Sequence, residues 1–212
     1  MTKTTPCPHC GFQHQCICND IPNIHSSLPI ALLMHENELS RDTNTGRLLL
    51  QTLPECSQHV WVRKEQPEAL LNRIKIQDLQ PYLLFPNEHS VDVTTLHDTT
   101  AAQNSAESDT SSQHQAIKPL FIILDGTWQE AKKMLRRSPW LKALPHVHLS
   151  STASSRYQLR RNQDDGHLCT CEVAIELLTQ LGETSSSIQL SQYFDHYMAM
   201  FKADKCGHLL KK

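Results

Sequence analysis

Short apolar runs along this chain alternate with longer segments in which apolar residues recur every three or four positions. The strongest run has five consecutive apolar residues, Leu120 to Leu124, and leads directly into Asp125. An uninterrupted run of this kind is typical of a central parallel strand that is covered on both faces. The strands predicted in this way are Pro29–Met34, His59–Val62, Pro81–Pro86, Pro119–Leu124 and His146–Leu149.

The segments between these runs predict helices. One helix is expected after Asn44 or Thr45, either of which can cap its first turn, and Pro54 follows its end. Further helices are expected at Trp128–Arg137, Cys171–Gly182 and Ile188–Lys205. Strands that alternate with helices predict an α/β fold, with a mostly parallel sheet flanked by helices.

Two segments differ in composition from this core. Residues 1–24 are rich in cysteine and are expected to form a small head that precedes one larger domain, residues 25–212. Residues 89–118 are dominated by Ser, Thr, Asp, Gln and His. Such a sequence can bury little apolar surface, so this segment is predicted to be a disordered insertion.

The overall charge sets limits on partners. The 212 residues include 20 Lys and Arg and 22 Asp and Glu, a formal net charge of −2 at pH 7. A nucleic acid would therefore have to bind local basic patches. No apolar run approaches the roughly 20 residues that span a membrane, and the N-terminus lacks the apolar region of a signal peptide. We expect a cytoplasmic protein with no membrane contact and no obligate protein partner.

Four of the eight cysteines lie close together in the head, in the sequence CPHCGFQHQCIC. Cys7 and Cys10 form one close pair, and Cys16 and Cys18 form another. Four thiolates complete the tetrahedral shell of Zn²⁺ and leave no position for water, which predicts a structural zinc site. A redox-active thiol cluster and an iron–sulfur cluster are the alternatives.

Asp125 stands where a strand meets a helix. In parallel α/β sheets, ligands bind beyond the carboxyl ends of the strands. Gly126 allows close approach of the backbone to a ligand, while Thr127 and Glu130 have the spacing of a capping box for the following helix. From this spacing alone, Asp125 is either a catalytic carboxylate or a further group at the helix N-terminus.

The sequence Asp-Gly-Thr-Trp at 125–128 resembles the Asp-x-Thr-Trp signature of the DTW-domain family. Other segments resemble elements of that family in the same order: the cysteine head, LLMHENELSRDTNTGRLL, LLFPNE, SSRYQLRR and CTCEVAIELL. The resemblance covers nearly the whole chain. It departs from the family pattern at Val173, where alanine often follows the glutamate, and in the insertion at 89–118.

The resemblance implies a fold and an activity. The family is that of the tRNA-uridine aminocarboxypropyltransferases, and its fold is similar to that of the knotted SPOUT methyltransferases. Such an enzyme transfers the 3-amino-3-carboxypropyl group of S-adenosylmethionine to N3 of a uridine in tRNA and releases 5′-methylthioadenosine. The variable-loop uridine at position 47 is the suggested target. Asp125 would accept the N3 proton or, alternatively, bind the amino group of the cofactor.

The resemblance also implies binding residues. The cofactor would contact Phe85, Pro86, Glu88, Gly126, Thr127, Trp128, Leu168, Thr170 and Glu172, with 168–172 forming the loop of the knot. Trp128 and Glu172 have simpler alternatives, namely core packing and a favourable charge in the first turn of a helix. The phosphates of tRNA would contact Arg41, Arg47, Lys132, Lys133, Arg136, Arg156 and Arg160. For any single one of these residues, the alternative is a solvated surface charge.

Two other functions fit part of the sequence. One is a SPOUT-type methyltransferase that acts on RNA with the same cofactor. The other is a zinc-knuckle RNA-binding protein without catalysis. The group that is added to tRNA separates the first alternative from aminocarboxypropyl transfer, and the effect of Asp125→Ala separates the second.

Overall fold

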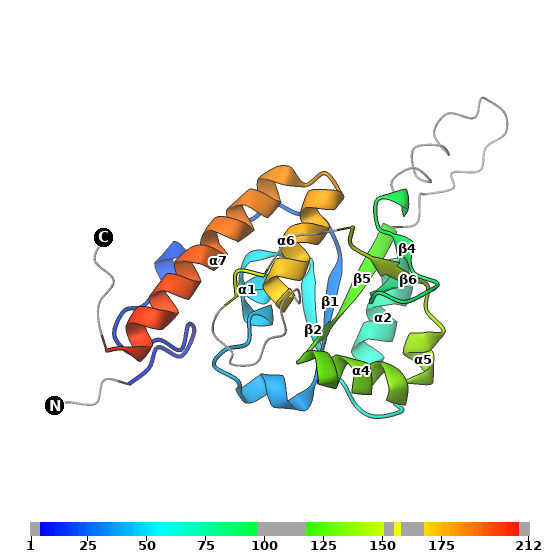
Figure 1. The fold of residues 1–212 in the computed structure, drawn as a ribbon, viewed down its shortest axis with the longest axis horizontal. Coiled ribbons are helices and arrows are strands. Elements are labelled where there is room, and N and C mark those ends of the chain that lie inside the picture. Colours follow the sequence, from blue (N-terminus) through cyan, green and yellow to red (C-terminus); the bar gives the residue numbers. More distant parts are fainter. Residues whose placement is uncertain (1–4, 97–117, 151–154, 158–167, 208–212) are drawn as a thin grey trace.

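The protein folds around one six-stranded sheet in which every pair of neighbouring strands is parallel (Figure 1). The computed structural model describes residues 5–96, 118–150, 155–157 and 168–207. The strand order is β2-β1-β5-β3-β6-β4. The strands are β1 (Ile30–Met34), β2 (Cys56–Val60), β3 (Leu79–Leu84), β4 (Val91–Asp92), β5 (Lys118–Asp125) and β6 (His146–His148). The predicted α/β fold with a mostly parallel sheet is confirmed.

Helices cover both faces of this sheet. Residues of α1, α6 and α7 pack in the apolar core on one face, and residues of α2, α4 and α5 pack in the core on the other. The helices are α1 (Gly46–Thr52), α2 (Glu68–Ile76), α4 (Trp128–Arg137), α5 (Pro139–Lys142), α6 (Thr170–Gln180) and α7 (Thr184–Lys205), with short 3₁₀ turns η1 (Cys18–Asp20) and η2 (Glu36–Ser40).

The central strands explain why the apolar runs are continuous. Successive side chains of a strand point to opposite faces of a sheet. In β1, Ile30 and Leu32 pack in the core beneath α6 and α7, whereas Ala31 and Leu33 pack in the core beneath α2 and α4. Both faces of β1 and β5 are covered, so neither strand has a polar side.

Several predicted boundaries are wrong at the edges of the fold. The second strand is Cys56–Val60 rather than His59–Val62, because β2 is an edge strand that pairs only with β1 and tolerates the polar residues Ser57 and Gln58. The apolar signal of the predicted strand comes from Trp61, which is buried after the strand has ended. The terminal helix begins at Thr184, before the predicted Ile188. The apolar pattern does not predict helix α2, because Leu70 is its only buried residue.

The predicted insertion at 89–118 contains ordered structure at both ends. Strand β4 pairs with β6 through Val91 and Asp92, and Val93 is fully buried. Lys118 is already the first residue of β5. The polar composition hid these short pieces, and the rest of the predicted insertion, 97–117, lies outside the described residues.

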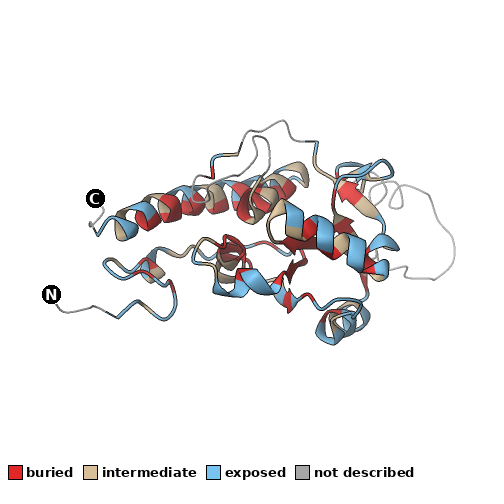
Figure 2. Ribbon diagram, turned by 60° about the horizontal axis from the view of Figure 1, so that its bottom comes forward, coloured by how far each residue is buried: buried red, intermediate tan, exposed pale blue. Residues whose placement is uncertain are grey.

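The cysteine head packs against the C-terminal half of α7 (Figure 1). The ring of Phe12 lies 5.4 Å from that of Tyr197 and 6.2 Å from that of Phe201, measured between centroids. Asp204 accepts hydrogen bonds from the backbone N–H groups of Gln13 and His14. Buried residues recur along α6 and α7 (Figure 2). Among the described residues, none of the helices combines the length and apolar character of a membrane span.

Candidate functional site

The carboxyl ends of β1, β5 and β3 lie side by side, and Asp125 stands at this carboxyl-terminal end of the sheet. Asp125 is the last residue of β5 and pairs in register with Met34 of β1. The backbone N–H of His35 donates to the Asp125 carbonyl at 2.9 Å. Phe85 follows β3 directly, so its side chain also belongs to this edge.

The Asp125 carboxylate is buried and held by two side chains. The residue is 2 % exposed. Thr170, at the start of α6, donates its hydroxyl to Oδ1 at 2.6 Å, and the amide nitrogen of Asn44 donates to Oδ2 at 2.8 Å. Two donors from segments far apart in the sequence therefore fix the direction of this carboxylate.

Gly46 makes this arrangement possible. A Cβ atom at this position would overlap Asp125 Oδ2 and would also crowd the side chain of Asn44. The absence of a side chain lets the first turn of α1 approach the end of β5. The glycine of the Asn-Thr-Gly-Arg segment is thus required by close packing on Asp125.

An ion-pair network continues from Asn44 to the start of α4. Asn44 also donates to Glu38 Oε2 at 2.9 Å, and the guanidinium of Arg41 contacts both Glu38 and Glu130. The hydrogen bonds to Glu130 raise the pKa of Arg41 above its usual value. Partial burial raises the pKa of Glu130, but hydrogen bonds from Arg41, Asn37 and Thr127 outweigh it and set that pKa well below the ordinary range.

The start of α4 has the predicted capping box. The Thr127 hydroxyl accepts from the Glu130 N–H, and the Glu130 carboxylate accepts from the Thr127 N–H. A Cβ on Gly126 would lie 3.1 Å from the Glu130 Cβ, so this turn is also tightly packed. The same carboxylate therefore caps the helix and binds Arg41.

Trp128 and Phe85, both predicted to bind the cofactor, stack on each other. Their ring centroids are 5.1 Å apart with an interplanar angle of 7°. The Lys132 ammonium lies 5.0 Å from the centroid of Trp128. The stack joins the end of β3 to the first turn of α4, while Pro86 and Glu88 are exposed beyond it.

Glu172 ties the segment 155–157 to the start of α6. It is buried and accepts hydrogen bonds from the Ser155 hydroxyl at 2.7 Å, the backbone N–H of Arg156 and the backbone N–H of Cys169 at 2.9 Å. The Tyr157 hydroxyl then donates to the Thr43 carbonyl at 2.6 Å. Leu168 is half-buried next to this turn. These contacts bring the Ser-Arg-Tyr, Thr-x-Glu and Asn-Thr-Gly-Arg segments together around Asp125.

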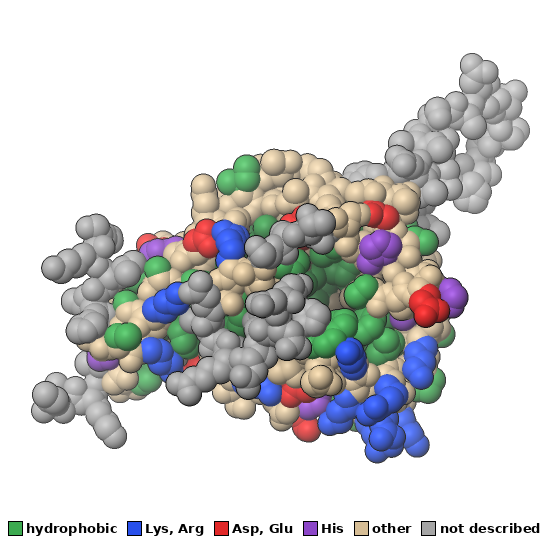
Figure 3. Space-filling model, in the orientation of Figure 1, with side chains coloured by type: hydrophobic (Ala, Val, Ile, Leu, Met, Phe, Trp, Pro, Cys, Tyr) green, Lys and Arg blue, Asp and Glu red, His purple; other side chains and the backbone are tan. Residues whose placement is uncertain are grey.

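The residues predicted to bind tRNA fall into two groups. Lys132, Lys133 and Arg136 are exposed on α4, together with Arg137, and Figure 3 shows a group of Lys and Arg side chains over this helix, beside a recessed hydrophobic surface. The arginines of the other segments bind groups of the same chain, and of these Arg156 is exposed. Arg41 binds Glu38 and Glu130, Arg47 donates to the Arg41 carbonyl at 3.0 Å, and Arg156 binds Asp195 at 2.8 Å. Arg160 lies outside the described residues.

The four cysteines of the head form a cluster that could hold a metal ion. All four Sγ atoms lie within 4.8 Å of one another. The Sγ–Sγ distances are 3.7 Å for Cys7–Cys18, 3.8 Å for Cys10–Cys16 and 3.6 Å for Cys7–Cys16. A regular tetrahedron with metal–sulfur bonds of about 2.3 Å has edges of about 3.8 Å, so the geometry fits a four-thiolate site.

Cys56, Cys169 and Cys171 do not belong to this cluster of possible metal ligands. Burial raises the pKa of both Cys56 and Cys169 to about 12, which keeps them as neutral thiols. Cys171 is fully buried, and its pKa is also raised by burial. These residues act as small apolar side chains in the core.

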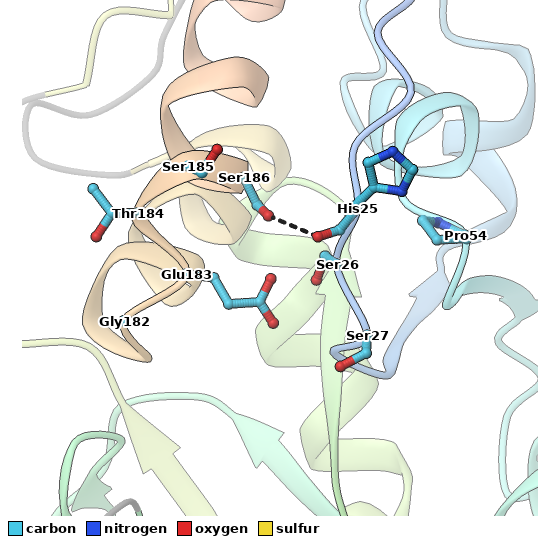
Figure 4. Close-up of a pocket in the computed structure, with 9 residues that line it drawn as sticks. All are labelled: His25, Ser26, Ser27, Pro54, Gly182, Glu183, Thr184, Ser185 and Ser186. Carbon is cyan, nitrogen blue, oxygen red and sulfur yellow. Dashed lines mark hydrogen bonds between the residues drawn. The ribbon is translucent and has the colours of Figure 1, made fainter.

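An open pocket of about 580 Å³ lies at the opposite end of the sheet, where the strands begin (Figure 4). His25, Ser26 and Ser27 line it just before β1, and residues 182–186 line it where α6 turns into α7. The hydroxyl of Ser186 donates to the His25 carbonyl at 3.3 Å across it. Since Asp125 stands at the carboxyl end of β5, this pocket takes no part in its surroundings.

The spacing of residues in the sequence does not identify Glu38 and Asn44 as members of the Asp125 site. It does not single out Glu38, and it indicates Asn44 only as a possible helix cap. The separation of Glu38 and Arg41 by three positions in a 3₁₀ turn is the available signal for an ion pair. Nothing in the sequence could indicate that Asn44 would reach a carboxylate 81 positions away.

Residues 4–202 match the family described as "DTW domain". The chain is 28% identical over 172 residues to tRNA-uridine aminocarboxypropyltransferase 2 of Drosophila melanogaster. This alignment covers 78% of the chain and 62% of the Drosophila protein. The chain is 24% identical over 194 residues to the protein of the same name in Mus musculus, covering 86% and 59%. The chain thus spans about three-fifths of these curated relatives. No solved structure matches it significantly.

Proposed function

Because the chain belongs to the DTW domain family, we propose that it is a tRNA-uridine aminocarboxypropyltransferase. The names of two relatives with this activity support the proposal. The structural observation that carries it is the placement of Asp125. This buried carboxylate ends the central strand, and the segments that resemble family motifs meet around it.

Asp125 has a defined task in this reaction. N3 of uracil carries a proton and is a poor nucleophile while it keeps it. Asp125 accepts that proton as the bond from N3 to the γ-carbon of the transferred group forms, and later releases it to water. The hydrogen bonds from Asn44 and Thr170 hold the carboxylate oxygens in a fixed direction for this transfer.

S-adenosylmethionine supplies the 3-amino-3-carboxypropyl group, and the bond between this group and sulfur breaks. The leaving group is the neutral thioether 5′-methylthioadenosine, so it does not need to be protonated by an acid. The chain's own residues hold and orient this donor. The segments that meet near Asp125 offer apolar, aromatic and backbone contacts for it. They contain Phe85, Pro86, Glu88, Gly126, Thr127, Trp128, Leu168, Thr170 and Glu172.

The basic face of α4 is the proposed contact with tRNA phosphates. Lys132, Lys133 and Arg136 project from this helix, which begins at Trp128, so a bound backbone would lie next to Asp125. Charge and counterion release would supply the affinity. The uridine at position 47 of the variable loop is the proposed target, with the base unstacked to reach Asp125.

The ion in the cysteine head is proposed to be zinc in a structural role. Four thiolates fill a tetrahedral shell, and zinc favours such sites. The cluster belongs to a head that packs on α7 rather than to the strand ends around Asp125. It therefore supports the fold and leaves the chemistry to other residues.

Nucleoside mass spectrometry of tRNA incubated with the protein and S-adenosylmethionine tests the activity. The expected product is a uridine nucleoside that has gained the aminocarboxypropyl group, and mass spectrometry of ribonuclease fragments of the same tRNA should place it at position 47. A gain of one methyl group instead would establish the methyltransferase alternative. Binding of tRNA without any modification would favour a non-catalytic RNA-binding protein.

Asp125→Asn tests the role of the carboxylate. Loss of a general base is expected to slow transfer about 10²–10⁴-fold, while the affinity for S-adenosylmethionine, measured by calorimetry, stays near that of the wild type. If the affinity falls in step with the rate, Asp125 binds the amino group of the donor and is not the base. Asp78→Asn changes an exposed aspartate that precedes β3, at the opposite edge of the sheet, and this matched control should transfer normally.

A further inference from the structure

Asp125 is bound by two neutral donors that approach it from different elements. The Thr170 hydroxyl comes from the first residue of α6, and the Asn44 amide comes from the turn before α1. Each donor contacts a different carboxylate oxygen. The plane and direction of the carboxylate are therefore set from both sides.

The orientation of the Asn44 amide is itself determined. Its oxygen accepts the backbone N–H of Arg47 at 3.1 Å, which requires the oxygen on that side and the NH₂ group on the other. One NH₂ hydrogen is directed to Asp125 and the other to Glu38 Oε2 at 2.9 Å. Asn44 thus bridges two carboxylates with the two hydrogens of its side chain.

Glu38 holds Asn44 in turn. Its carboxylate is buried, with the residue 1 % exposed, and a buried carboxylate is costly unless it is paired. Arg41 provides the pairing and extends it to Glu130 through hydrogen bonds of 2.8 and 2.9 Å. The network runs without a break from the cap of α4 to Asp125.

We infer that Asn44 and Thr170 are positioning residues for Asp125 and that Glu38 and Arg41 hold Asn44 in place. This inference rests on the proposed function, since positioning has a catalytic consequence only if Asp125 reacts. It assigns the Arg41 side chain to its ion pairs with Glu38 and Glu130, and assigns the Thr170 hydroxyl to the Asp125 carboxylate.

The physical consequence is a strong dependence of rate on a small displacement. A shift of a reacting group by about 1 Å can cost about 10²-fold in rate. Loss of either donor removes one of the hydrogen bonds that fix the direction of the Asp125 carboxylate. The chemical step should slow while binding of tRNA, which depends on surface cations, is little affected.

Thr170 offers a matched pair of variants. Thr170→Val keeps the shape of the side chain and removes the hydroxyl, whereas Thr170→Ser keeps the hydroxyl. We expect Thr170→Val to lower kcat at least about 10-fold with KM for tRNA within about 2-fold of the wild type, and Thr170→Ser to restore kcat to within about 3-fold. Equal kcat in Thr170→Val and the wild type, or equal loss in both variants, would overturn the inference.

A double-mutant cycle tests the contact without any activity assay. Asn44→Ala, Asp125→Ala and the double variant are compared by urea unfolding, with Thr170→Val and Asp125→Ala as a second cycle if Asn44→Ala does not fold. Coupled residues should give a double variant whose unfolding equilibrium constant departs at least about 3-fold from the product of the single changes, whereas agreement within about 2-fold would refute the coupling. If the wild type unfolds cooperatively but transfers no aminocarboxypropyl group to tRNA, the proposed function is refuted. The double-mutant cycle still shows whether Asn44 and Asp125 are coupled.

Discussion

Glu130 makes both a local contact, within the first turn of α4, and a long-range contact, with Arg41. Its carboxylate caps the N-terminus of α4 through Thr127, and it also receives the guanidinium of Arg41 and the amide of Asn37. The capping contact joins residues three positions apart, while the contact with Arg41 joins residues 89 positions apart. One side chain thereby links the start of the helix to the turn that holds Asn44.

The pKa of Glu130 makes stability depend on pH in a definite direction. Its pKa in the folded state is lower than the ordinary 4.5, so the unfolded state binds the proton more readily. The contribution to stability is complete above pH 4.5 and is lost as the pH falls towards the folded pKa. Glu130→Gln should cost about 1.5–3 kcal/mol at pH 7, the usual range for hydrogen bonds to a charged group.

Urea unfolding between pH 7 and pH 3 measures this effect. Below pH 4.5, the free energy of unfolding of the wild type should fall more steeply than that of Glu130→Gln, by up to about 1.4 kcal/mol per pH unit. Glu36→Gln removes an exposed carboxylate from the neighbouring turn and corrects for the general loss of one charge. Parallel curves for Glu130→Gln and the wild type would show that the ion pair does not contribute.

The residue scale also shows what sequence can predict about the site. The position of Asp125 and the capping box of Thr127 and Glu130 follow from local patterns, and the structure confirms both. The contact of Asn44 with Asp125 depends on the register that places Met34 opposite Asp125, which no local pattern contains. Arg41 is predicted to contact the phosphates of tRNA, but in the structure its guanidinium binds the carboxylates of Glu38 and Glu130.

At the scale of elements, burial decides which predictions succeed. The predicted strand at Pro119–Leu124 agrees with β5 within one residue at each end, because this strand is apolar on both faces. The predicted helix at Trp128–Arg137 agrees with α4, in which Ala131 and Met134 are buried and the cations are exposed. Strand β2 lies at the edge of the sheet, and helix α2 buries only Leu70, so the apolar pattern is weak in both elements.

The exposed face of α4 carries a prediction of its own. Lys133→Ala with Arg136→Ala should weaken binding of tRNA and reduce the slope of log K against log salt by about 0.7–0.9 for each phosphate that is no longer neutralised. Filter binding at several salt concentrations measures the slope. Lys75→Ala is the control, because Lys75 is equally exposed but precedes β3 and so lies at the opposite edge of the sheet. An unchanged slope in the α4 variant would place tRNA elsewhere.

At the scale of the whole molecule, the cysteine head is joined to the site through α7. Phe12 is buried against Tyr197 and Phe201, and Lys205 near the end of α7 binds Asp42 at 2.9 Å. Asp42 lies two positions before Asn44. The match to the DTW family begins at residue 4, so the head belongs to the same family unit as the strand ends. Metal in the head should therefore stabilise the fold as a whole.

Cys16→Ser tests this coupling. Cys16 is an exposed member of the cluster, so the substitution removes a ligand with little change in packing. We expect about one zinc per chain in the wild type and its loss in the variant, measured by elemental analysis. If the head then detaches, exposure of Phe12 alone costs about 2 kcal/mol, which lowers Tm by roughly 4–8 °C.

The control for this experiment is Cys206→Ser, which removes an equally exposed thiol outside the cluster and should keep both metal and Tm. Zinc binding and packing of Phe12 on α7 are coupled only if the variant that loses the metal also melts earlier. A Cys16→Ser variant that loses zinc but melts with the wild type would mean that the head is held by its aromatic contacts alone, because metal binding and packing on α7 would then be independent.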